Sequence, residues 1–246
     1  MSVALVTGGG GGIGRAIALR LAAGGADVAV VDLDGDRGAQ TARLVEAMGR
    51  RALFLKADVS RSAEVEGFVA ATEERLGAID AFANNAGVEG VVAPIFDYPD
   101  EVFDQLMAVN ARGVFLGLKH VLGRMRRRGT GAVVNTASSS AVRGRPGLAG
   151  YVATKHAVLG LTRVAALDVA GTAIRVNAVL TGPIETRMIR ALDAQARKDG
   201  GIRRAAMSAA YGRPEDVAGV VAFLLSAEAA HVNGAAWAVD AGATVA

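Results

Sequence analysis

The chain of 246 residues is 52% hydrophobic and 4% aromatic, contains 32 glycines, and carries a formal net charge of +3. A chain of this length can bury the core of one large domain, and abundant glycine with few aromatic side chains predicts an interior of small aliphatic residues, as in α/β proteins. Because the sequence contains no cysteine, its composition excludes disulfides and thiolate chemistry.

The N-terminal residues run directly into an apolar strand pattern, with no basic segment followed by a long apolar stretch. We therefore expect neither a signal peptide nor a membrane span. The cytoplasm is the location that we expect by default.

Short apolar runs alternate with helix-length amphipathic segments along the whole chain. Strands are predicted at residues 3–7, 27–32, 51–57, 79–84, 132–137, 173–180 and 235–239, and helices at about 12–24, 35–49, 61–76, 101–128, 150–170 and 214–226. This alternation predicts a single α/β domain over residues 1–246, with a mainly parallel sheet of seven strands and helices on both faces. The two longest irregular segments, 86–100 and 181–213, follow strands at their carboxyl ends and are the expected substrate-side loops.

A run of glycines joins the first predicted strand to the first predicted helix. Glycine permits a tight turn and lets the backbone approach a pyrophosphate, whose charge is met by the N-terminus of the helix. Two spacings fit: Gly9, Gly11 and Gly14, or Gly8, Gly12 and Gly14. The run itself does not choose between them.

Asp32 closes the second predicted strand, eighteen residues after Gly14. A carboxylate at this position can accept hydrogen bonds from both ribose hydroxyls of an adenosine and would repel a 2′-phosphate. The next residue is Leu33, so no arginine stands there to receive that phosphate. The pair predicts NAD rather than NADP; the alternative is that Asp32 caps the following turn.

The remaining charged residues do not indicate nucleic acid or metal as a partner. The one dense basic run precedes Gly129 at the end of a predicted helix, where cations complement the helix dipole; it comprises Arg124, Arg126, Arg127 and Arg128. The three histidines show no spacing of metal ligands with each other or with acidic residues; they are His120, His156 and His231.

Tyr151 and Lys155 lie four positions apart, with Ser138 thirteen residues before the tyrosine. The predicted helix at 150–170 places the phenol and the ammonium on one face. An ammonium about 4 Å away contributes roughly 4 kcal/mol at an effective dielectric of about 20, enough to bring the pKa of a tyrosine from ~10 toward neutrality. The plain alternative is a surface lysine beside a half-buried tyrosine.

Together with the segment 84–87 and Asn110, these motifs resemble those of the short-chain dehydrogenase/reductase family over essentially the whole chain. The resemblance implies a Rossmann-like fold and the spacing Gly8, Gly12, Gly14. It also implies that Tyr151 is the general acid or base and that Ser138 binds the substrate oxygen. Lys155 would hold the nicotinamide ribose and lower the pKa of the tyrosine, and Asn110 would position a water in a proton relay.

The resemblance further implies two sets of contact residues. The cofactor would contact Gly8, Gly12, Ile13, Gly14, Asp32, Asp58, Val59, Asn85, Ala86, Gly87, Tyr151, Lys155, Gly182, Ile184 and Thr186. The substrate pocket would contain Val88, Ser138, Ser140, Val142, Leu148, Tyr151, Ile184 and Met188. Most of the second set are apolar, which predicts a carbon-rich substrate.

The residues themselves leave other interpretations open for some of these positions. Ser138 could belong to a simple turn, Asn110 is ordinarily a poor helix residue, and Asp58 could cap the next helix. The sequence also departs from the family pattern. Thr181 replaces a usual proline, which puts the rigidity of that loop in doubt, and Ala241 replaces a usual glycine.

The predicted reaction is reversible hydride transfer between NAD and a secondary alcohol or its ketone. One alternative is a 3-oxoacyl-[acyl carrier protein] reductase that uses NADPH and docks its acidic carrier on Arg126 to Arg128. A more remote alternative is an inactive nucleotide-sensing protein. The resemblance also implies a homotetramer or homodimer that associates through the helices at 101–128 and 150–170.

Overall fold

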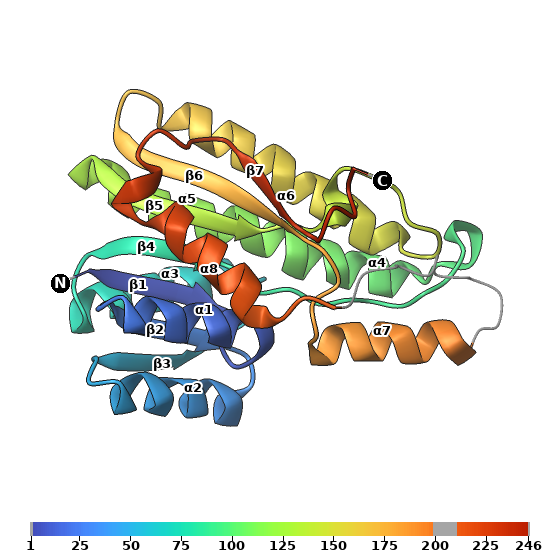
Figure 1. Cartoon of the computed structure of the whole chain (residues 1–246), viewed down its shortest axis with the longest axis horizontal. Coiled ribbons are helices and arrows are strands. Elements are labelled where there is room, and N and C mark those ends of the chain that lie inside the picture. Colours follow the sequence, from blue (N-terminus) through green and yellow to red (C-terminus); the bar gives the residue numbers. More distant parts are fainter. Residues whose placement is uncertain (1, 199–210, 246) are drawn as a thin grey trace.

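The computed structural model describes residues 2–198 and 211–245, which form one domain around a seven-stranded, entirely parallel sheet. The strand order is β3-β2-β1-β4-β5-β6-β7 (Figure 1). The strands are β1 (Val3–Thr7), β2 (Asp27–Asp32), β3 (Ala52–Lys56), β4 (Ile79–Asn84), β5 (Thr130–Thr136), β6 (Ala173–Thr181) and β7 (Ala236–Val239). Residues of the central strands are buried on both faces, which explains their continuous apolar runs.

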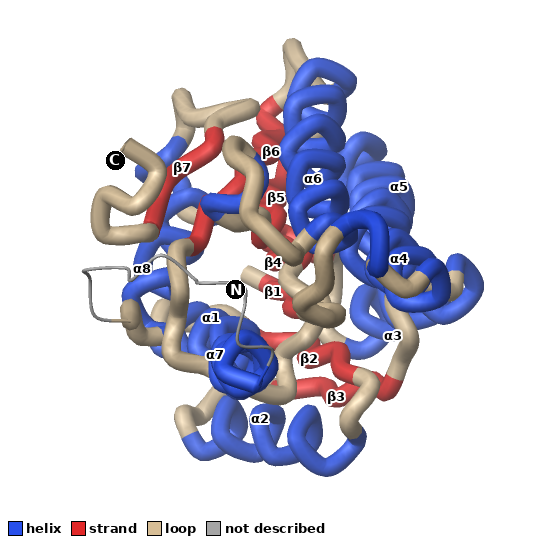
Figure 2. Tube along the Cα trace, turned by 90° about the vertical axis from the view of Figure 1, so that its right-hand side faces the viewer, coloured by secondary structure: helices blue, strands red, loops and turns tan. Residues whose placement is uncertain are grey.

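Helices cover both faces of the sheet, as Figure 2 shows. One core packs beneath α3 (Ser62–Arg75), α5 (Gly113–Arg128) and α6 (Ala149–Asp168). The other packs beneath α1 (Gly12–Ala23), α2 (Gly35–Ala47) and α8 (Pro214–Leu225). The predicted α/β class, the parallel sheet and the two helical layers are therefore confirmed.

The long helix predicted at 101–128 is interrupted. It consists of α4 (Asp100–Leu106), a π-helical segment (Met107–Arg112) that contains Asn110, and α5. A π-helical turn inside an α-helix is frequent at functional sites because it re-aims side chains. Short 3₁₀ segments lie at Ile95–Asp97 (η1), Ser139–Ala141 (η3) and Ala227–Ala229 (η4).

The sequence had indicated that the segment 181–213 is irregular, but part of it is helical. It contains α7 (Arg187–Lys198), while residues 199–210 lie outside the described part of the chain. The buried side chains of α7 include Ile189 and Leu192, which cover barely one turn.

The strand order reverses at β1, which pairs with β2 on one side and with β4 on the other. The connections that leave β1 and β4 run to opposite faces of the sheet, so a crevice opens beyond their carboxyl ends. The glycine run leaves β1 at this point, and Asn85 follows β4.

Candidate active site

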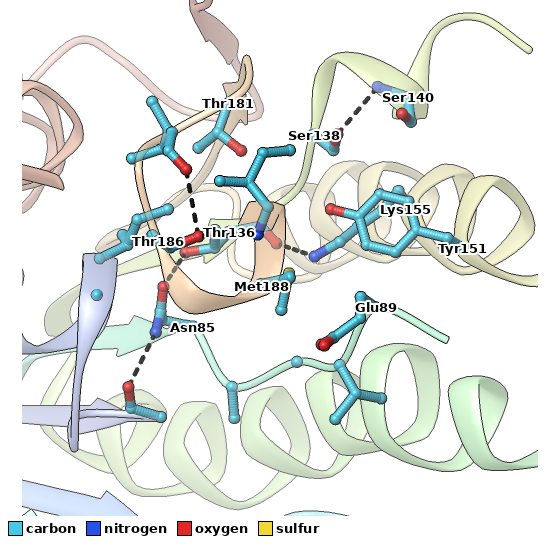
Figure 3. A pocket seen from close by; sticks show the side chains of 18 of the residues that line it. Asn85, Glu89, Thr136, Ser138, Ser140, Tyr151, Lys155, Thr181, Thr186 and Met188 are labelled. Carbon is cyan, nitrogen blue, oxygen red and sulfur yellow. Dashed lines mark hydrogen bonds between the residues drawn. The ribbon is translucent and has the colours of Figure 1, made fainter. Parts of the chain in front are cut away.

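A cavity of about 1260 Å³ lies beyond the carboxyl ends of the strands (Figure 3). Every residue of the predicted cofactor set lines it, although they are spread from Gly8 to Thr186 in the sequence. Of the predicted substrate residues, all but Val142 line it. Val142 follows η3 and is 48% exposed, and its assignment to the pocket stays a prediction.

The turn after β1 requires glycine at Gly8, Gly12 and Gly14, the second of the two spacings that the sequence allows. Gly8 and Gly12 have φ angles of 64° and 50°, in the left-handed region that L side chains rarely adopt. A Cβ at Gly8 would lie 2.8 Å from Cα of Ala86, and a Cβ at Gly14 would overlap the carbonyl oxygen of Gly8. The N-cap of α1 is Gly11, which has no side chain to accept hydrogen bonds from the first helical N–H groups. A backbone that borders a cavity in this way fits an anionic group such as a pyrophosphate.

Asp32 ends β2 beside this turn. Its Oδ2 accepts a hydrogen bond from the backbone N–H of Gly10 at 2.7 Å, and its Oδ1 accepts one from Asp34 at 2.9 Å. The carboxylate thus does cap a turn, and it also lines the cavity. The two interpretations of Asp32 are compatible.

Arg37 was missed by the sequence reasoning, which considered only the position after Asp32. It lies in the first turn of α2, lines the same end of the cavity as Asp32, and its guanidinium packs against Gly11. The approach depends on α2 folding back over the glycine turn, so spacing alone could not predict it. A cation therefore stands close to the carboxylate that was expected to repel a 2′-phosphate.

Three polar residues join the ends of β1, β4 and β5. The hydroxyl of Thr7 accepts from the backbone N–H groups of Asn85 and Ala86, at 3.0 and 3.1 Å. The side chain of Asn85 accepts from Thr136 Oγ1 at 3.1 Å and donates to the carbonyl of Thr7 at 3.1 Å (Figure 3). These bonds fix the floor of the cavity without using a charged group.

Asn110 is buried in the π-helical turn and does not line the cavity itself. Its Oδ1 accepts from the backbone N–H of Val88 and its Nδ2 donates to the carbonyl of the same residue, both at 2.8 Å. Gly87 lies between Asn110 and Lys155, since a Cβ there would be 3.2 Å from Asn110 Oδ1 and 3.9 Å from Lys155 Nζ. Asn110 thereby holds the backbone that borders the cavity after β4.

Ser138, Tyr151 and Lys155 meet on one side of the cavity (Figure 3). Lys155 Nζ donates to the carbonyl of Thr136 at 2.8 Å and lies 5.5 Å from the centre of the Tyr151 ring. Ser138 Oγ accepts from the backbone N–H of Ser140 at 3.1 Å, so Ser138 also caps the turn that it begins. The predicted face of the helix is thus turned toward the cavity, and the surface-lysine interpretation is wrong because Lys155 is buried.

The electrostatics of this group differ from the expectation. Burial raises the pKa of Tyr151, and the charge of Glu89 adds to the rise. A hydrogen bond from Ser138 and the charge of Arg145 lower it, but burial is the largest cause. Burial also lowers the pKa of Lys155 to about 8. The direction for Tyr151 is thus opposite to the expected one, with burial as its largest cause, and the lowering of its pKa by Lys155 stays a prediction.

Asp58 serves the turn that precedes α3 rather than capping the helix itself. Its Oδ1 accepts from the backbone N–H and the hydroxyl of Ser60, at 2.9 and 2.7 Å, whereas the N-cap of α3 is Arg61. Asp58 also lines the cavity.

The loop after β6 is held without the proline that is usual in the family. Thr181 still belongs to β6, the backbone N–H of Gly182 donates to Val239 at 2.9 Å, and Glu185 donates to Gly212 at 2.8 Å. These backbone bonds tie the loop to the segments around β7 and before α8. Ala241 has a φ angle of 51°, the region that favours the glycine it replaces.

Residues 2–198 and 211–245 contain no group of three or more His, Cys, Asp or Glu side chains that could hold a metal ion. Within the same residues, every helix is too short or too polar to traverse a lipid bilayer.

Comparisons with known proteins agree with this geometry. A family model described as enoyl-(acyl carrier protein) reductase matches residues 9–244. Levodione reductase of Leifsonia aquatica is 44% identical over 253 residues, which covers 99% of this chain and 94% of that protein. The crystal structure of levodione reductase has a TM-score of 0.93 at 42% identity, covering 100% of this chain and 98% of that one. The crystal structure of NAD⁺-bound xylitol dehydrogenase has a TM-score of 0.90 at 33% identity and covers 97% of each chain.

Proposed function

The chain belongs to the short-chain dehydrogenase/reductase family and interconverts a secondary alcohol and its ketone by hydride transfer, and on that premise we propose that its cofactor is NAD and that Tyr151 carries the proton. The observation that carries the proposal is the meeting of Ser138, Tyr151 and Lys155 at a cavity that also contains the glycine turn and Asp32. The bound nicotinamide would supply the hydride acceptor or donor.

The residues of the cavity fit such a cofactor. Gly8, Gly12 and Gly14 leave room for a pyrophosphate beside the N-terminus of α1, and Asp32 can accept from the adenosine ribose. At the other end, we propose that Lys155 holds the nicotinamide ribose, that Ser138 binds the substrate oxygen and that Tyr151 exchanges its proton. Asn110 is proposed to order a water behind Lys155.

We expect kcat/KM with NAD to exceed that with NADP by about 100-fold, because a carboxylate beside the 2′-position repels a phosphate. Asp32→Asn retains the shape and the oxygen that accepts from Gly10 but removes the charge. With Arg37 nearby, this variant is expected to gain about 10-fold in its preference for NADP relative to NAD. Asp36→Asn, an exposed change in the same turn of α2, is the control and should leave the ratio unchanged. A wild-type preference for NADP would contradict the proposal.

The reaction is tested by following NADH formation across secondary alcohols and NADH consumption across the matching ketones. The solved relative with the higher identity is a levodione reductase and another is a xylitol dehydrogenase, so both cyclic ketones and linear polyols belong in the screen. Tight NAD binding with no turnover of any of them would favour the nucleotide-sensing alternative.

The carrier-protein alternative receives support from the description of the family model but not from the basic run. Arg124 and Arg128 are paired with Glu73 at 3.2 and 3.3 Å, and Arg128 also donates to the carbonyl of Ile79, where β4 begins. The run therefore lies at the amino end of the sheet, away from the cavity at the carboxyl ends. A carrier docked there would not deliver its acyl chain to Tyr151.

We also propose that the protein is a homotetramer or homodimer that associates through α5 and α6. Apolar side chains on these helices face solvent: Phe115 is 47% exposed, Val164 57% and Leu167 75%. A second copy would remove them from water. Light scattering is expected to give two or four times the mass of one chain, and the Val164→Glu, Leu167→Glu variant should lower it. A monomeric wild type would contradict the proposal.

A further inference from the structure

Arg145 lies in the loop between η3 and α6 and folds back over the serine turn. Its Nε donates to Oγ of Ser140 at 3.1 Å, and an Nη donates to Oγ of Ser139 at 3.0 Å. Both serines are buried, and all three residues line the cavity. The guanidinium therefore ties the loop that leads into α6 to the turn that carries Ser138.

This attachment restricts the hydroxyl that faces Tyr151. Ser138 Oγ accepts from the backbone N–H of Ser140 (Figure 3). The hydrogen bonds from Arg145 to Ser139 and Ser140 hold the other end of the same short turn. Neither Ser139 nor Ser140 is itself ionised, and each can rotate its hydroxyl to accept from a cation. A fixed Ser138 favours proton transfer because small displacements of reacting groups cost large factors in rate.

The charge of Arg145 also acts on the phenol. Burial raises the pKa of Tyr151, and the hydrogen bond from Ser138 and the positive charge of Arg145 oppose that rise. Lys155 points to the carbonyl of Thr136, and burial lowers its pKa to about 8, so its charge is lost as the solution becomes alkaline. A guanidinium, by contrast, keeps its charge throughout that range.

We propose that Arg145 is a positioning residue for proton transfer, whose guanidinium holds the turn of Ser138 against the phenol and supplies a permanent charge that favours the phenolate. The proposal rests on the role of Tyr151 given above and adds a second cation to the site.

Other charged and titratable groups face Tyr151 and must be held constant in any test. Lys155 follows it on α6, Arg143 lines the cavity from the same loop as Arg145, and Glu89 lies in the segment after β4. Tyr98, from the segment before α4, lies against Gly150. Of these groups, Glu89 opposes Arg145 because it raises the pKa of Tyr151.

The first measurement is the titration of Tyr151 itself in protein without added cofactor. The chain has three tyrosines, so labelling with ¹³C at Cζ gives three signals, and Tyr151→Phe identifies the relevant one. Arg145→Met is expected to raise the pKa of Tyr151 by about half a unit or more, whereas Arg145→Lys, which keeps the charge, should shift it much less. Arg126→Met, an exposed change in the last turn of α5, should leave it unchanged.

The second measurement is the pH dependence of kcat/KM for alcohol oxidation, which requires the phenolate. Arg145→Met should displace the rising limb to higher pH by the same shift. The Ser139→Ala, Ser140→Ala variant retains the charge but loses the hydrogen bonds that Arg145 donates to these two serines, so kcat should fall several-fold with the rising limb in place. Far-UV circular dichroism verifies that each variant is folded.

The outcomes separate this inference from the proposed function. An unchanged titration of Tyr151 in Arg145→Met, or equal shifts in the Met and Lys variants, overturns the role of the charge. Wild-type kinetics in the double serine variant overturns the role of the hydrogen bonds. Full turnover by Tyr151→Phe would instead refute the proposed function, while the titration would still report whether Arg145 acts on the phenol.

Discussion

Replacing Tyr151 by Phe is expected to lower kcat by about 10³-fold or more, with NAD binding nearly unchanged. The substitution removes a single oxygen, and a positioned general acid or base typically contributes between about 10² and 10⁴ in rate. The ring is held among buried residues of α6 and should keep its place. Stopped-flow or steady-state NADH absorbance gives kcat, and titration calorimetry gives the Kd for NAD.

Tyr211→Phe is the matched control for this change. Tyr211 is exposed and its hydroxyl contacts Asp193 rather than the group around Ser138, so activity should be retained. Undiminished turnover in Tyr151→Phe would contradict the assignment of the proton to the phenol. A loss of activity that is fully explained by weaker NAD binding would contradict it equally.

Lys155→Met is expected to lower kcat/KM by about 10²-fold or more while making the protein more stable at pH 7. The pKa of Lys155 is lowered from 10.5 to about 8, a displacement of about 2.5 units that corresponds to roughly 3 kcal/mol of destabilisation when the group is charged. The lost hydrogen bond to Thr136 offsets about 1 kcal/mol or more of that gain. A net increase of about 1–2 kcal/mol in the free energy of unfolding is therefore expected.

The stability gained by Lys155→Met should depend on pH. Below pH 8 the lysine is protonated in both the folded and the unfolded chain, so the whole destabilisation is present. Between pH 8 and 10.5 the folded protein releases the proton while the unfolded chain keeps it, so stability rises with pH through this window. The advantage of Lys155→Met over wild type should therefore shrink between pH 7 and pH 10, as measured by urea denaturation.

The control is Lys56→Met, at an exposed position at the end of β3. Its free energy of unfolding should equal that of wild type at pH 7 and at pH 10. A Lys155→Met protein that is less stable than wild type at pH 7 would show that the buried charge of Lys155 does not destabilise the folded protein. The comparison therefore tests whether burying the charge of Lys155 lowers the free energy of unfolding.

The sequence by itself determined the features that depend on short-range pattern. Short continuous apolar runs predicted the strands, because a parallel sheet covered by helices is buried on both faces. Apolar periodicity predicted most of the helices, because one buried face repeats at every third to fourth residue. Spacing predicted that Tyr151 and Lys155 share a helix face, and the glycine run predicted the turn after β1. The acidic end of β2 marked Asp32 for the same local reason.

Only the tertiary structure decided what depends on residues brought together from distant segments. Arg37 reaches the glycine turn because α2 folds back, and Arg145 meets Ser139 and Ser140 across a loop. The pKa directions of Tyr151 and Lys155 follow from burial, which spacing cannot express, because desolvation depends on every group packed around a charge. Local pattern thus specified side chains that meet at the cavity, and three-dimensional packing specified their electrostatics.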